Sequence, residues 1–382
     1  MKKAIITVLI ITLVAAAIPV THAAASPGTS AASAILFDAA GKSVLYQSNI
    51  DQRMRIASTT KIMTALVVLD NCRLDAVVEI KPEYAGIEGS SMYIKAGEQL
   101  TVLELLYGLM LPSGNDAAVA LACYVSGSVE NFAAMMNSRA QALGCENSNF
   151  KNPHGLDADG HYSTARDLAL ITAEAMKYSA FCDIISTKQV TIAGRVLENH
   201  NRLLWRYDGM LGGKTGYTKS SGRSLVTCAM RDGMRLICVT LNDPDDWDDH
   251  TALYDWAFGE FQCVTLSKSD LRYISLPVIS GVQGTVSVRP ADDFAYVCKK
   301  TEKLDLTVET PHFVYAGVIK GARAGNIIVR KNGETVAEVP LVFSENVMVD
   351  GEIKLSGWER LKWSWYFANS RGGTLGNGYI MY

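Results

Sequence analysis

The sequence predicts an α+β protein: an antiparallel sheet flanked by helices, with a helical subdomain, followed by a small all-β domain. Three observations lead to this prediction. Short β-type runs lie at both ends of the first 263 residues, the part from about 100 to 185 is largely helical, and short alternating strands follow from 264. Strands at both ends of a helical middle suggest that the first and last strands meet in one sheet.

The first 25 residues are typical of a secretory signal peptide. Two lysines precede an apolar stretch from Ala4 to Ile18, and small residues follow, with candidate cleavage sites that end at Ala23 and Ala25. About 15 apolar residues are fewer than the ~20 that a membrane-spanning helix needs. We therefore expect cleavage and a mature protein that works outside the cytoplasm.

Two short strands and a buried helix are expected at the start of the first domain, which we place at residues 26–263. The strands surround the turn Ala40-Gly41. The helix begins near Ser58, and it is apolar on every side, which indicates a buried element.

Three further helices follow from local signals. Thr101 and Glu104 form a capping box, so a second helix starts there and ends before Pro112. We expect a third helix to begin at Asp116 and a fourth to end at Gly144.

Eight cysteines are scattered along the chain without a C-x-x-C pair, so we expect buried free thiols and no metal site. The hairpin turn at 231–234 joins the strands that carry Cys228 and Cys238. In that register Cys228 faces residue 237, so the two thiols point to opposite faces, unless a one-residue bulge shifts the pairing.

The second domain is expected at residues 264–348. The stretch KNGE at 331–334 is a strong signal for a type I′ hairpin. The composition, 48% hydrophobic and 20% charged with a net charge of −3, is that of a globular protein without a basic surface. Nucleic acid is therefore not expected as a partner.

Three short motifs carry the chemistry: STTK at 58–61, SGN at 113–115 and KTG at 214–216. Each is weak alone, but their order in an exported chain is hard to attribute to chance. Ser58 and Lys61 share one helix face, so the lysine can take the serine proton if it is partly neutral. Burial and the second cation, Lys214, both lower the pKa of Lys61.

The other two motifs complete a candidate site. Ser113 and Asn115 could simply cap the next helix. With the other motifs, Ser113 is expected to relay a proton to a leaving amine, and Asn115 to orient Lys61 and a substrate amide. Asp208 stands where a phosphate-binding P-loop needs glycine, so that alternative for the KTG segment fails.

The KTG strand suits a carboxylate better. Lys214 and Thr215 offer a cation and a donor, and Gly216 lets substrate backbone approach. The backbone N–H groups of Ser58 and Tyr217 could form an oxyanion hole. No cofactor or metal is expected, and the histidines at 154, 161 and 200 are interpreted as structural.

Together with NPHGLDADGHYSTARDLA (152–169), NRLL (201–204) and the trailing β domain, these motifs make the chain resemble the D-alanyl-D-alanine carboxypeptidases. These are low-molecular-weight penicillin-binding proteins of serine peptidase family S11, with a DD-peptidase/β-lactamase-like fold. The resemblance covers roughly residues 30–348. It implies that Ser58 forms an acyl-enzyme, that the terminal D-alanine of peptidoglycan stem pentapeptides is released, and that β-lactams acylate the same serine. It also implies a place at the outer face of the cytoplasmic membrane, in the cell wall or in the periplasm.

Two alternatives remain open. A β-lactamase of the same fold needs a glutamate for fast deacylation, but Glu198 lies only 16 residues (214 − 198) before Lys214, too close for that loop, and the extra domain argues against it. The other alternative is a catalytically inactive, wall-binding scaffold. Covalent labelling of Ser58 by a fluorescent penicillin separates these functions.

The tail, residues 349–382, has a partly amphipathic pattern. Five apolar positions fall on roughly one helical face, although a lysine lies within the apolar arc. Relatives in the family often end in such a helix on the membrane, so the tail is a candidate for peripheral membrane contact. The apolar positions are Leu355, Trp358, Leu361, Trp365 and Tyr366.

Overall fold

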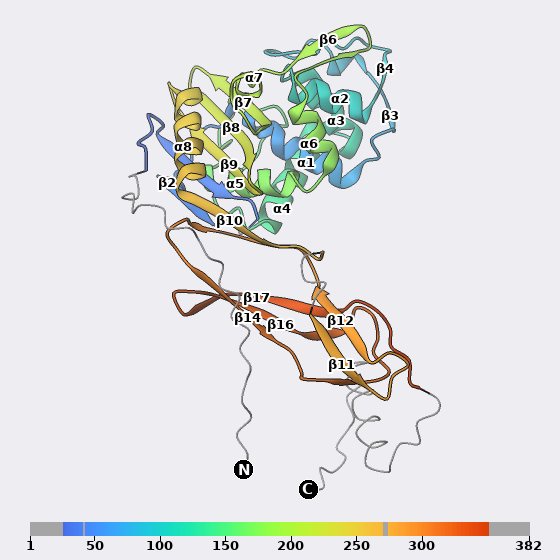
Figure 1. The fold of residues 1–382 in the computed structure, drawn as a ribbon. Coiled ribbons are helices and arrows are strands. Elements are labelled where there is room, and N and C mark those ends of the chain that lie inside the picture. Colours follow the sequence, from blue (N-terminus) through green and yellow to red (C-terminus); the bar gives the residue numbers. More distant parts are fainter. Residues whose placement is uncertain (1–25, 41–42, 270–273, 351–382) are drawn as a thin grey trace. The chain divides into compact units, whose positions relative to one another are not determined.

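The computed structural model describes residues 26–40, 43–269 and 274–350 (Figure 1). The chain divides into two compact units, one that ends at Gln262 and one that begins at Cys263. The predicted signal peptide and nearly all of the predicted tail lie outside the described residues.

The first unit contains a five-stranded antiparallel sheet in the order β2-β1-β9-β8-β7. Its first strand pairs with its last, with Ile35 opposite Val239, as the sequence predicts. Strand β7, which carries the KTG motif, lies at the edge and therefore has one side without a strand partner. The strands are β1 (Ser33–Asp38), β2 (Val44–Ser48), β7 (Met210–Thr218), β8 (Gly222–Arg231) and β9 (Met234–Leu241).

Helices cover both faces of this sheet (Figure 1). The last helix, α8 (Asp246–Glu260), packs on β8 and β9, while α5 (Ala165–Ala175) packs on β1 and β9 from the other side. The remaining helical elements are η1 (Ala57–Thr60), α1 (Lys61–Asn71), η2 (Pro82–Tyr84), α2 (Val102–Met110), α3 (Asn115–Ser126), α4 (Val129–Ala142), α6 (Ser179–Ser186) and α7 (Leu203–Arg206).

The helix boundaries follow the local signals closely. The capping box is present: Glu104 N donates to Thr101 Oγ1 at 3.2 Å, and Thr101 N donates to the Glu104 carboxylate at 2.7 Å. Helix α2 ends before Pro112, and α4 ends two residues before Gly144. The expected start of α3 at Asp116 is wrong by one residue, because Gly114 is the N-cap and Asn115 already lies in the helix.

Helix α1 is the centre of the first core. Eight of its residues are buried, from Lys61 to Val68, and the helix packs against α2, α3, α4 and α5. Among the described residues, no single helix is long and apolar enough to cross a membrane; α3 and α4 meet the criterion only as a pair bent by 82°.

Two small antiparallel strand pairs, which the sequence analysis did not assign, complete the first unit. One pairs β3 (Val77–Glu79) with β4 (Gln99–Thr101), and the other pairs β5 (Gln189–Ile192) with β6 (Arg195–Glu198).

The turn between β8 and β9 has the predicted register. Arg231 lies opposite Met234, and Cys228 lies opposite Ile237, without a bulge. Cys228 and Cys238 are buried free thiols on neighbouring strands with side chains on opposite faces.

The second unit is all-β. Its six-stranded sheet has the order β14-β16-β17-β12-β11-β15, and β10 pairs with β13. In the predicted type I′ hairpin, Lys331 lies opposite Glu334, and Asn332 and Gly333 have φ of 52° and 86°. The strands are β10 (Phe261–Leu266), β11 (Ser275–Ile279), β12 (Thr285–Pro290), β13 (Phe294–Lys299), β14 (Leu304–Glu309), β15 (Val314–Tyr315), β16 (Arg323–Lys331) and β17 (Glu334–Phe343).

Candidate active site

Ser58 lies in the short 3-10 turn η1, and Lys61 is the first residue of α1. The lysine side chain is 0% exposed, yet its Nζ donates to Ser58 Oγ at 3.0 Å. Two further acceptors surround Nζ: Asn115 Oδ1 at 2.7 Å and the main-chain oxygen of His154 at 2.8 Å. The structure thus brings the serine and lysine into contact, and it fixes the lysine from two other elements.

The surroundings of Lys61 favour its neutral form. Burial lowers the pKa of Lys61 well below its ordinary value of 10.5, and the positive charge of Lys214 lowers it further. The carboxylate of Asp116 acts in the opposite sense, to a smaller extent. A lysine whose neutral form is favoured in this way can act as a general base.

The SGN motif forms the turn between α2 and α3. Ser113 has a φ of 63°, a conformation that residues other than glycine rarely adopt. Its hydroxyl is buried and has no hydrogen-bond partner among the described residues, although Ser113 lines the cavity described below. No side chain caps α3, so the capping interpretation of Ser113 and Asn115 is wrong.

The amide nitrogen of Asn115 is also fixed by a hydrogen bond. This nitrogen donates to the Glu88 carbonyl at 2.6 Å, which turns the side-chain oxygen toward Lys61. Asp116 anchors the same loop, because its carboxylate accepts bonds from the backbone N–H groups of Met92 and Ile94.

Strand β7 forms the wall opposite the SGN turn. A Cβ at Gly216 would lie 3.0 Å from Ile56 O and 3.1 Å from Ser58 N, so the strand runs directly against the turn that carries Ser58. Tyr217, the next residue, is 67% exposed. A larger residue than glycine at 216 would push this strand away from Ser58.

Lys214 is buried, whereas Thr215 beside it is partly exposed. The lysine is 2% exposed, its Nζ donates to Thr215 O at 3.1 Å, and burial lowers its pKa to about 7. Because Lys214 is buried, its charge acts at a distance: it lowers the pKa of Lys61 and makes the electrostatic potential around Thr215 more positive.

A cavity of about 320 Å³ opens above Ser58. It combines site residues from all three motifs with six that the sequence analysis did not assign to the site. The lining residues are Ser58, Ser90, Ser113, His200, Arg202, Thr215, Gly216, Tyr217, Arg223, Asp246 and Trp247.

Arg223 and Asp246 form an ion pair at the rim, with Arg223 Nη2 2.7 Å from Asp246 Oδ1. The guanidinium also lies over the Trp247 ring, 5.7 Å from its centroid. The segment SGR at 221–223 matches no recognisable motif, so the sequence analysis did not identify Arg223 as a residue of the cavity.

The histidines have different roles. His161 Nε2 and Thr60 Oγ1 lie 2.9 Å apart, and burial lowers the pKa of His161 to about 4. Leu156 N donates to His154 Nδ1, so both rings make structural hydrogen bonds, as expected. His200 lines the cavity instead.

Comparisons with known proteins agree with this architecture. The family described as D-alanyl-D-alanine carboxypeptidase matches residues 20–245, and the penicillin-binding protein 5, C-terminal domain, matches residues 261–348. DacF, a D-alanyl-D-alanine carboxypeptidase of Bacillus subtilis (strain 168), is 31% identical over 87% of this chain and 91% of its own. DacC of Escherichia coli (strain K12), with the same description, is 35% identical over 85% of this chain and 86% of its own.

Solved structures give the same result. The crystal structure of penicillin-binding protein 5 from Haemophilus influenzae matches with a TM-score of 0.69 and 30% identity, covering 85% of this chain and 99% of that one. The α+β unit and the all-β unit are therefore those of a DD-peptidase. The chain belongs to the D-alanyl-D-alanine carboxypeptidase family and is a serine-type carboxypeptidase.

Proposed function

We propose that this protein removes the terminal D-alanine from peptidoglycan stem pentapeptides through an acyl-enzyme on Ser58. The observation that carries the proposal is the contact between Ser58 Oγ and Lys61 Nζ, 3.0 Å apart, with the lysine fully buried. A neutral lysine at that distance removes the proton that makes a serine hydroxyl a poor nucleophile.

In the first step, Ser58 Oγ attacks the carbonyl carbon between the two D-alanines while its proton passes to Lys61. The C–N bond then breaks, and the leaving amine receives the proton of Lys61 through Ser113. This residue lines the same cavity, and its buried hydroxyl has no hydrogen-bond partner in the part of the chain that the structure describes. Water hydrolyses the ester in the second step, and the proton released by that water restores the Ser58 hydroxyl. Lys61 serves as the base in both steps.

Strand β7 supplies the substrate-binding wall. We assign Thr215 to the terminal carboxylate, with Lys214 supplying positive potential from behind it. Gly216 leaves room for the peptide backbone, and the N–H groups of Ser58 and Tyr217 form the oxyanion hole. Because the site binds the terminal carboxylate of the substrate, the enzyme removes a terminal residue and does not cleave inside a peptide.

β-Lactams are expected to acylate Ser58 and to be released slowly. Of the residues that line the cavity, only Asp246 carries a carboxylate, and Arg223 already binds it. The site therefore lacks a free carboxylate to activate water, which distinguishes this proposal from a β-lactamase.

Mass spectrometry of a D-Ala-D-Ala peptide tests the proposal. The wild-type protein is expected to release one alanine, and Ser58→Ala none. Ser138→Ala, which removes an exposed hydroxyl on α4, is the matched control and should act as the wild type does. Intact peptide with the wild type, or equal turnover by Ser58→Ala, contradicts the mechanism.

We further propose that the protein is exported and contacts the membrane through its tail. The support is the composition of residues 1–25 and the amphipathic pattern within 349–382. If the chain that lacks residues 351–382 still sediments with membranes, the role of the tail is wrong.

A further inference from the structure

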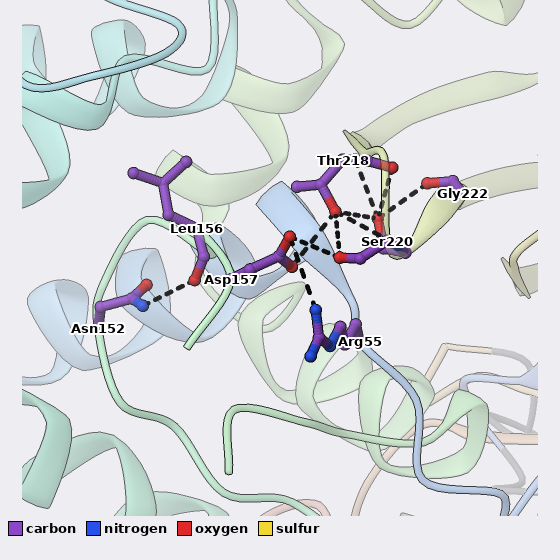
Figure 2. Close-up of polar contacts among 8 residues, drawn as sticks. Arg55, Asn152, Leu156, Asp157, Thr218, Ser220 and Gly222 are labelled. Carbon is purple, nitrogen blue, oxygen red and sulfur yellow. Dashed lines mark hydrogen bonds and ion pairs between the residues drawn. The ribbon is translucent and has the colours of Figure 1, made fainter. Parts of the chain in front are cut away.

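Asp157 lies in the loop between α4 and α5 and joins it to two other segments (Figure 2). Ser220 Oγ donates to Asp157 Oδ2 at 2.5 Å, and Thr218 Oγ1 donates to Oδ1 at 3.3 Å. Arg55 Nη1 lies 3.9 Å from the same carboxylate. One side chain thus connects this loop, the β7–β8 turn and the segment that leads into η1.

The loop is also where Lys61 finds its main-chain acceptor. His154 O, three residues before Asp157, accepts from Lys61 Nζ at 2.8 Å. Asn152 stabilises this part of the loop, because its Oδ1 accepts from Gly155 N at 2.7 Å and its Nδ2 donates to Leu156 O at 2.9 Å. Asp157 follows directly after this bonded stretch and connects it to Ser220 and Thr218.

The β7–β8 turn is itself tightly bonded. Thr218 N donates to Ser221 Oγ at 2.9 Å, and the same hydroxyl donates to Gly222 O at 2.9 Å. This turn ends β7, the strand that lies against Ser58. Hydroxyl groups that donate to an ionised carboxylate form stronger hydrogen bonds than neutral pairs do, so the connection through Asp157 resists displacement of either segment.

We propose that Asp157 is a positioning residue for acyl transfer: it fixes the loop that holds the His154 carbonyl against Lys61, and so sets the geometry of the Ser58–Lys61 pair. This role rests on the proposed acyl-enzyme chemistry. Arg55 contributes little, because its side chain and that of Asp157 are 47% and 36% exposed and the two are 3.9 Å apart. The hydroxyl contacts carry the role.

Acylation by a fluorescent penicillin, measured across penicillin concentrations, tests this role. Asp157→Ala is expected to lower the maximal acylation rate constant by about 10- to 100-fold, because small misplacements at a reacting centre have effects of that size. The half-saturating concentration should change by less than about twofold. A purely structural role would instead lower thermal stability and leave this rate constant unchanged.

Two more variants sharpen the test. Asp159→Ala removes another exposed carboxylate two residues away in the same loop, which takes no part in these contacts, and should match the wild type. Ser220→Ala should reduce the rate constant less than Asp157→Ala, and the double variant should be no slower than Asp157→Ala alone. If Asp157→Ala does not fold, the acylation rate constant of Ser220→Ala tests the positioning role in its place.

A wild-type acylation rate constant in folded Asp157→Ala, or in Ser220→Ala when that variant decides, overturns the positioning role. A rise in the half-saturating concentration alone also overturns it, since that would place Asp157 in binding. Absence of label on the wild-type chain would refute the proposed function itself, and this role with it.

Discussion

Replacing Lys214 with methionine should stabilise the protein while removing the cation that we assign to the proposed active site. Lys214 is 2% exposed, and burial lowers its pKa from 10.5 to about 7. At about 1.4 kcal/mol per pKa unit, this lowering corresponds to about 5 kcal/mol of unfavourable free energy for the charged form. Since about half of the lysine is still protonated at pH 7, we expect Lys214→Met to raise the free energy of unfolding there by about 4 kcal/mol.

The pH dependence has a definite sign. Between pH 7 and 10.5 the unfolded chain binds a proton that folded Lys214 has lost, so the stability of the wild type rises with pH across this window. The advantage of Lys214→Met therefore shrinks as the pH approaches 10.5. Removing the charge also raises the pKa of Lys61, which adds to the stabilisation at pH 7.

Urea unfolding near pH 7 and near pH 10 measures both effects. Lys219→Met is the matched control, because this lysine is exposed in the neighbouring turn and should change stability little at either pH. If Lys214→Met is less stable than the wild type at pH 7, or if its advantage does not diminish toward pH 10, the assignment of a buried, destabilising lysine is refuted. Loss of penicillin labelling should accompany the gain in stability.

Two further predictions concern the first unit. Gly155→Ala should slow acylation and lower the free energy of unfolding by at least about 1–2 kcal/mol, because Gly155 has a φ of 87° and a Cβ there would lie 1.9 Å from Ala57 O. Gly160→Ala is the control, because Gly160 has a φ of 77° but the nearest atom to a Cβ there would be 3.4 Å away. It should retain wild-type acylation in a penicillin-labelling assay. Equal acylation by both variants would contradict the packing argument. Burial raises the pKa of Asp243 to about 6, so the folded protein keeps a proton that the unfolded chain releases above 3.8, and wild-type stability falls as pH rises through that window. Asp243→Asn should remove this fall. If the free energy of unfolding changes with pH in the same way for both proteins from about pH 4 to pH 7, the prediction is wrong.

The elements best predicted from sequence depend on a few contiguous residues. The capping box of Thr101 and Glu104 and the hairpin at 331–334 each need only four positions, and both are present as predicted. The register that separates Cys228 from Cys238 follows from the turn alone. In these cases the local energetics and the tertiary fold favour the same conformation, so the short sequence pattern is sufficient to predict the structure.

The site residues that sequence reasoning missed act through contacts that a sequence does not display. The acceptor at residue 154 is a main-chain oxygen, which any amino acid could supply. Arg223 meets Asp246 only because α8 packs on β8 and brings its first turn beside that strand. The strained φ of Ser113 was not visible either, because a backbone conformation of this kind is not specific to serine.

The three oxygens around Lys61 Nζ determine the direction of its lone pair once the lysine is neutral. An ammonium group has three hydrogens, whereas a neutral amine has two and one lone pair. Asn115 Oδ1 and His154 O can only accept, and the Glu88 contact keeps the Asn115 amide from turning over. When Lys61 loses its proton, these two oxygens hold both remaining hydrogens. The lone pair must then face the third direction, toward Ser58, whose hydroxyl is the only one of the three neighbours able to donate a proton to it.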